Sequence, residues 1–217
     1  CMGGYDARAR DAVVALAGLL RGAGVEYAIL GPDEGCCGDP ARRAGNESLW
    51  RDLAERNLAV LATRSYGHIV TLCPHCANTL ANEYADLGAA LTVSHAAPYL
   101  AGLLREGRLK PNPLPGRAAG NSVEGVRPLR VGLHDPCYLA RGMGDTASTR
   151  ALLAALPGVQ PVELPSHGRD TLCCGAGGGR MWLDGPEEPR LSEPRLSQVV
   201  AAGVDLCVTA CPYCRTM

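Results

Sequence analysis

The pattern of apolar and polar residues alternates between helix and strand periods along the whole chain. In the first half, apolar positions at helical spacing predict helices over residues 7–22, 46–61, 77–84 and 97–105, and short β-branched runs predict strands over 25–30 and 68–72. The second half has strands over 129–135, 159–164 and 204–210 and helices over 146–155 and 193–202. This alternation predicts a parallel α/β sheet in each half.

The cysteines repeat with a period near 137 residues. Cys-Cys-Gly occurs at 36–38 and again at 173–175, and IVTLCPHC (69–76) corresponds to CVTACPYC (207–214). A repeat with matched surroundings indicates a duplication of one structural unit. The first set is Cys1, Cys36, Cys37, Cys73 and Cys76, and the second set is Cys137, Cys173, Cys174, Cys211 and Cys214.

Two pseudo-symmetric, Rossmann-like units are therefore expected. The segment between them is rich in Pro, Gly, Asn and Ser, a composition typical of linkers. We place the first unit at 1–109, the linker at 110–127 and the second unit at 128–217. A strand is predicted directly before Cys137, whereas the sequence begins at Cys1, so we expect the first unit to be N-terminally truncated and the chain to be a piece of a longer protein.

Composition excludes several classes of function. The formal net charge is −1 and aromatic residues make up 4% of the chain, so neither a basic surface nor a stacking platform for nucleic acid is expected. The apolar runs are too short to span a bilayer, and no signal peptide opens the sequence. We expect a cytoplasmic protein, which would reach the cytoplasmic face of a membrane only through segments outside this sequence.

The eleven cysteines point to metal rather than to disulfides. Their number is odd, and adjacent Cys–Cys pairs and C-x-x-C turns bring thiols too close together for ordinary long-loop disulfides. We expect the motif cysteines to follow strands, so that they meet at the carboxyl edge of each sheet, where ligands usually bind. Five thiols exceed a zinc tetrahedron and fit an iron–sulfur cluster better, with zinc in one or both units left as the alternative.

A few neighbouring residues have two interpretations. His134, three residues before Cys137, is a candidate for proton transfer beside the metal, or a structural histidine that holds the loop. His75 lies inside the first C-x-x-C, where it would hydrogen-bond a sulfur or face solvent. Gly38 and Gly175 are expected to let the backbone bend sharply after each Cys pair. Cys207 has no counterpart in the first unit and is expected to be a core residue.

The five-position pattern resembles the cysteine-rich CCG domain, which occurs in pairs in heterodisulfide reductases and related iron–sulfur oxidoreductases. The resemblance covers essentially the whole chain. The strings CCGDPARRAGNE (36–47), LHDPCYLAR (133–141) and CCGAGGGRMW (173–182) are most similar to the C-terminal part of the larger, membrane-associated members. Those proteins carry an upstream membrane segment and a ferredoxin domain, and some are thought to pass electrons from electron-transfer flavoprotein to menaquinone.

The resemblance implies up to two 4Fe–4S clusters, one for each set of five cysteines, which are non-cubane in the heterodisulfide reductases. A cubane cluster or zinc in one unit stays open. The expected function is an iron–sulfur electron-transfer module of an oxidoreductase, working with a ferredoxin-type domain, a flavoprotein or a quinone module. The alternative is a zinc-stabilised interaction module without a redox role. The sequence leaves the electron donor and acceptor, the catalytic residues apart from the candidate His134, and the oligomeric state open.

Overall fold

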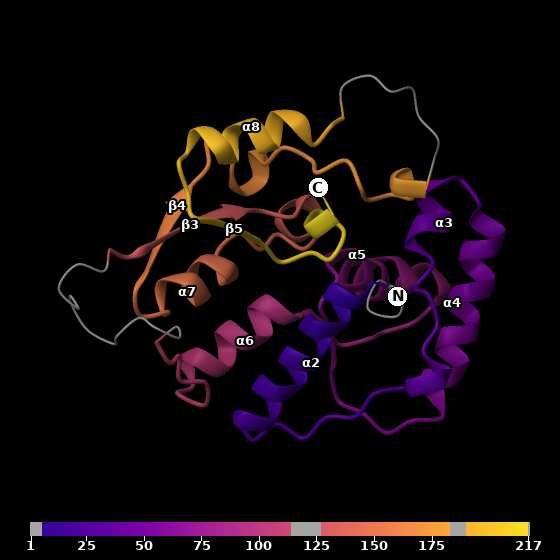
Figure 1. Cartoon of the computed structure of the whole chain (residues 1–217). Coiled ribbons are helices and arrows are strands. Elements are labelled where there is room, and N and C mark those ends of the chain that lie inside the picture. Colours follow the sequence, from indigo (N-terminus) through magenta and orange to yellow (C-terminus); the bar gives the residue numbers. More distant parts are fainter. Residues whose placement is uncertain (1–5, 114–126, 183–189, 217) are drawn as a thin grey trace.

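The structure is a computed structural model that describes residues 6–113, 127–182 and 190–216. It is a mixed α/β fold with two separate parallel sheets, one in each repeat (Figure 1). Cys1 and most of the expected linker lie outside the described residues.

The first unit has a two-stranded sheet of β1 (Ile69–Thr71) and β2 (Val93–His95). Two long helices, α2 (Ala7–Gly22) and α6 (Ala96–Arg105), pack on it, and their leucines form one core with the partly buried Val70 of β1. Each helix begins at a side-chain cap: Asp6 accepts from the amides of Arg8 and Ala9, and His95 accepts from the amide of Ala97.

The first unit also has a second group of helices, which packs around a core of its own. It includes α3 (Asp39–Arg43) and α4 (Glu47–Ala62). Helix α4 packs through Trp50 and Ala54 against Tyr84, and Ala41 of α3 packs against the same core. Tyr84 belongs to a continuous helical stretch made of α5 (Pro74–Asn78), a π-helical turn η2 (Thr79–Glu83) and a 3₁₀ turn η3 (Tyr84–Leu87). A further 3₁₀ turn, η1 (Gly31–Asp33), precedes the first Cys pair.

The second unit has a three-stranded parallel sheet in the order β4 (Val159–Glu163), β3 (Leu129–His134), β5 (Leu206–Thr209). The helices α7 (Ser148–Ala154) and α8 (Glu193–Ala201) lie on opposite sides of it (Figure 1). Short turns complete the unit: the π-helical η4 (Tyr138–Gly142) and the 3₁₀ turns η5 (Gly168–Asp170), η6 (Arg180–Trp182) and η7 (Cys214–Thr216).

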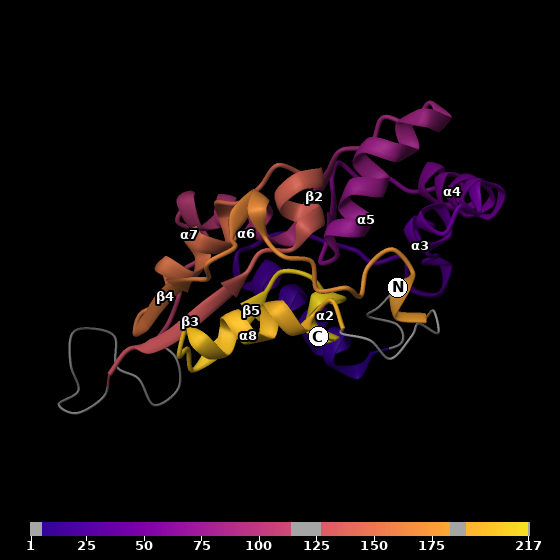
Figure 2. The same cartoon turned by 90° about the horizontal axis from the view of Figure 1, so that it is seen from above.

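The two units pack directly against each other. Helix α6 contacts α7, and α5, which follows Cys73, contacts the π-helical turn η4, which follows Cys137 (Figure 2). At this second contact a Cβ added to Gly142 would lie 2.9 Å from Oδ1 of Asn78, so a glycine lets the two turns approach closely. The cysteine-bearing segments of both units therefore lie at the contact between the units.

Most of the predicted elements are confirmed, with ends shifted by a few residues. The strand expected over 25–30 is wrong, because these residues form no strand, and β2 was not predicted. In the second unit the corresponding strand β4 pairs with β3. Among the described residues of the first unit, no strand takes the place of β3, so the segment 25–30 has no such neighbour to pair with. Strand formation depends on a partner of this kind.

The described residues contain no helix that is both long and apolar enough to cross a membrane.

Candidate metal centres at the contact between the units

Three of the cysteine positions lie just beyond the carboxyl ends of strands. Cys73 follows β1 and is the N-cap residue of α5, Cys211 follows β5, and Cys137 follows β3. The Cys pairs differ from the prediction. Cys36 and Cys37 follow no strand, and nine residues separate the end of β4 from Cys173. The convergence of thiols at the carboxyl edges is confirmed for the C-x-x-C positions and for Cys137.

Each Cys pair is followed by a glycine in the left-handed region, with φ of +87° at Gly38 and +79° at Gly175. The sharp bend that these glycines were predicted to allow is confirmed. The bend turns the glycine amide back toward the first cysteine of the pair. Gly38 N donates to Cys36 Sγ at 3.4 Å, and Gly175 N donates to Cys173 Sγ at 3.3 Å. The two units therefore hold one thiol each by the same backbone hydrogen bond.

In the first unit, the four described motif cysteines form a connected group of free thiols. Cys37 Sγ and Cys76 Sγ lie 3.4 Å apart, Cys36 contacts Cys37, and Cys73 contacts Cys76. The Cys37 thiol is the main reason that the pKa of Cys36 falls to about 6. The hydrogen bond from Cys37 likewise lowers the pKa of Cys76, while the donors Cys37 and Cys73 have raised pKa values.

In the second unit, all five motif cysteines are connected in the order Cys137, Cys173, Cys174, Cys214, Cys211. Cys173 accepts hydrogen bonds from its two neighbours, Cys137 first, and its pKa falls to about 2. Cys137, at the end of the group, has a raised pKa because it donates to Cys173. Negative charge is thus stabilised at Cys173, and at Cys211, where hydrogen bonds outweigh burial and lower the pKa.

The two groups of thiols touch. Cys73 of the first unit hydrogen-bonds Cys211 of the second, and both are at the first position of their C-x-x-C motifs. The residues at the third position also meet, since the rings of His75 and Tyr213 lie 5.0 Å apart in an edge-on arrangement. Equivalent residues that face each other in this way are expected about a pseudo-two-fold axis. The two candidate centres are therefore neighbours across that axis.

His134 ends β3 and is fully buried, and neither ring nitrogen has a hydrogen-bond partner among the described residues. One of its nitrogens and the sulfurs of Cys174 and Cys214 all lie within 4.8 Å of one another. Burial, with the nearby positive charge of Arg195, lowers the pKa of His134 to about 4. A neutral imidazole beside two thiols could act as a metal ligand or as a hydrogen-bond donor to a bound group.

Asp135, the next residue, anchors the loops around this centre. Its carboxylate accepts two hydrogen bonds from Arg150, at 2.7 and 2.8 Å, and one from the amide of Gly168 at 2.6 Å. Its backbone carbonyl accepts from Thr171 Oγ1 at 3.0 Å. Thr171 in turn accepts from the buried Arg195 at 2.6 Å. This network fixes the segment that leads to Cys173, and sequence reasoning missed the roles of Asp135 and Arg195.

His75 was expected either to contact a sulfur or to face solvent, and the structure buries it at 4% exposure. Nδ1 lies 2.9 Å from Asp39 Oδ2, and the ring stacks on Tyr138 of the second unit with 3.9 Å between centroids. The imidazole also hydrogen-bonds Cys211. Burial opposes its charge, but these bonds to Asp39 and Cys211 outweigh burial and raise its pKa to about 9.

The glycine run 175–179 has a structural explanation. A Cβ at Gly177 would lie 2.6 Å from Cε1 of His75, Gly178 faces Arg43, and Gly179 faces the carbonyl of Pro40. The run therefore packs against the first unit. Its first two amides donate to cysteine sulfurs, Gly175 N to Cys173 and Ala176 N to Cys174.

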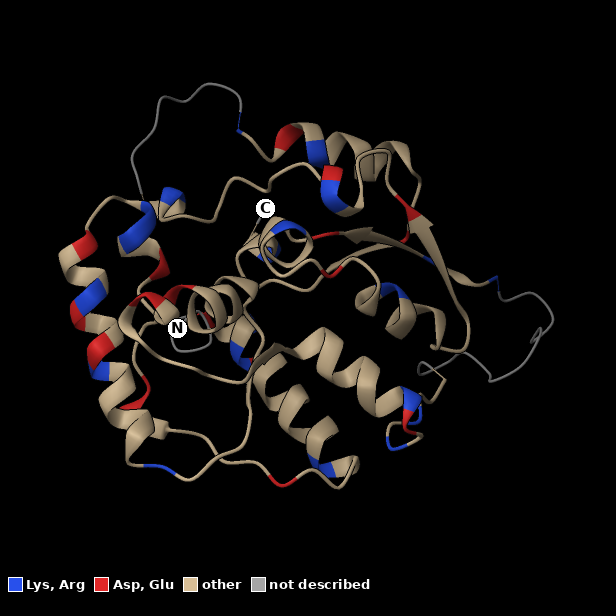
Figure 3. Ribbon diagram, turned by 180° about the vertical axis from the view of Figure 1, so that it is seen from behind, with Lys and Arg blue, Asp and Glu red and all other residues tan. Residues whose placement is uncertain are grey.

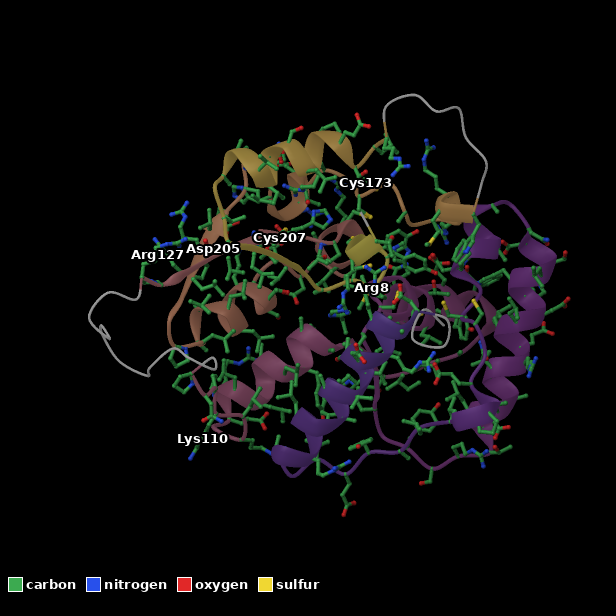
Figure 4. The ribbon with its side chains drawn as sticks, viewed as in Figure 1. Arg8, Lys110, Arg127, Cys173, Asp205 and Cys207 are labelled. Carbon is green, nitrogen blue, oxygen red and sulfur yellow. The ribbon has the colours of Figure 1, made fainter. Side chains whose placement is uncertain are left out.

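Cys207 lies on β5, where it pairs with Gly132, and the structure keeps it apart from the group that contains Cys173 (Figure 4). It is half-buried, so it is less enclosed than the core residue that the sequence predicted.

Charges of both signs are interspersed along α4, seen from behind in Figure 3. At the start of this helix Glu47 lies 3.4 Å from Arg42 of α3. Arg42 also contacts Glu83 and Asp86 and stacks over Trp50 at 3.9 Å.

Comparison with known proteins gives one family over most of the chain. Residues 1–81 and 131–217 match the CCG family, described as a cysteine-rich domain. The chain is 38% identical over 218 residues to a probable iron–sulfur-binding oxidoreductase, FadF, of Bacillus subtilis, covering 100% of this chain and 29% of that protein. It is 37% identical over 226 residues to an EtfAB:quinone oxidoreductase of Syntrophomonas wolfei, covering 100% of this chain and 30% of the relative.

A more distant relative is one of the subunits of the dihydromethanophenazine:CoB–CoM heterodisulfide reductase of Methanosarcina mazei. It is 29% identical over 221 residues, which are 99% of this chain and 51% of that relative. The chain spans between 29% and 51% of the lengths of these three relatives. The two matched segments contain the two cysteine repeats. The first includes β1 and ends before β2, and the second includes most of the three-stranded sheet. The chain belongs to the CCG family of cysteine-rich domains and carries two copies of that domain.

Proposed function

We propose that the chain is the electron-transfer module of an iron–sulfur oxidoreductase and holds two iron–sulfur clusters, one in each cysteine set. The single observation that supports this most is the gathering of nine described motif thiols, all free, into two groups that touch through Cys73 and Cys211. The ligands of one cluster would be Cys1, Cys36, Cys37, Cys73 and Cys76, and those of the other Cys137, Cys173, Cys174, Cys211 and Cys214.

The residues present fit such a group. Two thiols in each set have lowered pKa values, Cys36 and Cys76 in the first and Cys173 and Cys211 in the second, and the thiolate is the form that binds iron. The fully buried His134 has two nitrogens without a partner among the described residues, beside Cys174 and Cys214, which is the arrangement expected if a bound group supplies that partner. Each set also has a backbone amide, of Gly38 or Gly175, that already donates to a sulfur.

Clusters of this kind take up and release single electrons. The chain contributes a buried contact between the two ligand sets: Cys73 and Cys211, at 7% and 4% exposure, exclude water from the place where the sets meet. The relatives' names include an EtfAB:quinone oxidoreductase and a heterodisulfide reductase. The partners that we propose are a flavoprotein, a ferredoxin-type domain or a quinone module, which would contact this chain at the cytoplasmic face of a membrane.

Two further parts of the proposal concern organisation and catalysis. We assign 1–109 and 128–217 as the two domains, with 110–127 as the linker. A catalytic role of this chain itself would require substrate at one of the centres, and His134 is the residue we would assign to proton transfer there, because it is buried and neutral beside two thiols.

The test is metal and sulfide analysis with low-temperature EPR on protein purified without oxygen. Two clusters of four predict about eight irons and as many acid-labile sulfides per chain. An EPR signal on reduction that accounts for both clusters would support two redox centres. Zinc without sulfide would contradict the proposal.

One observation favours the second candidate, a zinc site without a redox role in the second unit. His134, Cys174 and Cys214 offer one nitrogen and two sulfurs within 4.8 Å, a compact set that suits a single zinc ion. Stoichiometric zinc that is lost in a His134→Ala variant, with iron retained only in the first unit, would support this candidate. Four irons and sulfides in the second unit would exclude it.

A further inference from the structure

Besides Cys73, a second buried side chain of the first unit, that of His75, interacts with the cysteine set of the second. His75 lies between Cys73 and Cys76 in sequence, but its ring stacks on Tyr138 and meets Tyr213 edge-on, both from the second unit. It reaches Cys211, the cysteine at which the second group touches the first. His75 therefore belongs to the first C-x-x-C motif in sequence and lies against the cysteine set of the second unit in space.

The orientation of the ring is set from both sides. Asp39, itself 1% exposed, lies 2.9 Å from Nδ1 through Oδ2, and Arg43 lies 3.5 Å from the other carboxylate oxygen. The opposite edge of the ring faces the second unit, because a Cβ on Gly177 would lie 2.6 Å from Cε1 and 2.9 Å from Nε2. With Nδ1 directed at Asp39, Nε2 is the nitrogen available to Cys211.

The second unit has no equivalent of the Asp39–His75 pair. The position equivalent to His75 is Tyr213, and the position equivalent to Asp39, the second after the Cys pair, is Ala176. The same five-cysteine framework thus carries an Asp–His pair on one side of the pseudo-two-fold axis and an alanine and a tyrosine on the other. The pair makes the surroundings of the two cysteine sets unequal.

We infer that His75, oriented by Asp39, is a positioning residue that acts across the unit boundary: it donates from Nε2 to Cys211 Sγ and raises the reduction potential of the centre held by the second cysteine set. The physical reason is that a hydrogen bond to a ligand sulfur stabilises the more negative, reduced state of a cluster. The inference rests on the proposed function, since it needs an iron–sulfur centre at Cys211.

The test is an EPR-monitored redox titration of the whole chain, purified without oxygen, with iron and sulfide measured on the same samples. His75→Phe removes both ring nitrogens and keeps an aromatic ring to stack on Tyr138. The variant is measured in two backgrounds: Cys37→Ser, to isolate the second centre, and Cys174→Ser, to isolate the first. We expect the potential of the second centre to fall, with little change in the first.

Two further variants separate the hydrogen bond from packing. His75→Gln keeps an N–H donor and is expected to restore most of the potential that Phe loses. Gly177→Ala displaces the edge of the His75 ring without changing any ionisable group. Like His75→Phe, it is expected to lower the potential of the second centre. Gly67→Ala is its matched control, because an added Cβ there meets nothing within 4 Å.

The outcomes are distinguishable. A second centre with the same potential in wild type, His75→Phe and Gly177→Ala overturns the inference, as does a shift confined to the first centre. If His75→Phe cannot be purified, the comparison of Gly177→Ala with Gly67→Ala decides the question alone. Wild-type protein without iron and sulfide would instead overturn the proposed function.

Discussion

The two units hold the same cysteine framework but support it in different ways. In the first unit the Cys pair is held through its backbone: Asn57 donates to the carbonyl of Cys36 at 2.7 Å, and the Tyr84 hydroxyl donates to that of Cys37 at 3.2 Å. In the second unit the support acts on the segment before the pair. Arg195 donates to Ser166 O and Thr171 Oγ1 in that segment, and Asp135, which is paired with Arg150, accepts from the amide of Gly168.

Side chains that reach the thiols differ as well. The second set has a buried neutral histidine, His134, from its own unit, and it also receives His75 from the other unit. The pKa of its Cys173 is lowered to about 2, against about 6 for Cys36, because Cys173 accepts from Cys137 in addition to its neighbour in the pair. Duplication therefore preserved the cysteine positions while their surroundings diverged, as the two proposed centres would require in order to have different potentials.

The largest effect is expected when a motif thiol is removed from one unit and the other unit is left unchanged. Cys174→Ser removes a buried thiol at the middle of the second group and is expected to halve the iron and sulfide content, from about eight to about four irons per chain. Cys37→Ser, at the equivalent place, should remove the other half. Metal analysis and EPR measure both, and Cys207→Ser is the control that should keep all the iron. Unchanged iron in Cys174→Ser would refute the ligand assignment.

The next effect tests the ionic support of the second unit. Asp135→Asn removes the buried carboxylate charge that Arg150 contacts at 2.7 Å. We expect this substitution to lower the free energy of unfolding by about 3 kcal/mol. Asp33→Asn, in a first-unit pair with Arg64 at 2.6 Å where both side chains are half-exposed, should cost less than about 1 kcal/mol. Urea unfolding followed by circular dichroism without oxygen measures both variants. Equal losses would contradict the view that the Asp135 network is a buried support.

The smallest expected effect concerns pH and the first unit. Burial lowers the pKa of His95, which caps α6 through Nδ1 and contacts the carbonyl of Leu72 through Nε2. As the pH falls through about 6.5, the unfolded chain binds a proton at His95 before the folded chain does, so the free energy of unfolding decreases as the pH is lowered through and below that value.

His95→Asn keeps a capping oxygen but cannot titrate, and its stability should change less as the pH falls through that value. The exposed His68→Asn is the control, with the same urea midpoints measured at each pH. A pH dependence as steep in His95→Asn as in the wild type would show that the loss arises elsewhere.

Prediction from the sequence succeeded where the signal was local. The helices α2, α4 and α6 have clear apolar periodicity, and the strands β1, β3 and β5 are short β-branched runs, so each was found. The segment 25–30 has the same composition as a strand but none of its pairing, and β2 is a three-residue strand without alternation. The cysteine sets were visible because a repeat of paired thiols is conspicuous, whereas Asp39, Asp135 and Tyr138 look like ordinary loop residues.

The duplication, the α/β class, the two sets of five thiols and the bend at Gly38 and Gly175 could all be read from the sequence, because each depends on spacing along the chain or on the conformational range of a single residue. The contact of the two sets through Cys73 and Cys211, and the contact of His75 with the second set, became visible only in the folded molecule. Those contacts join residues far apart along the chain. They depend on how two sheets pack about a pseudo-two-fold axis, which no local pattern contains.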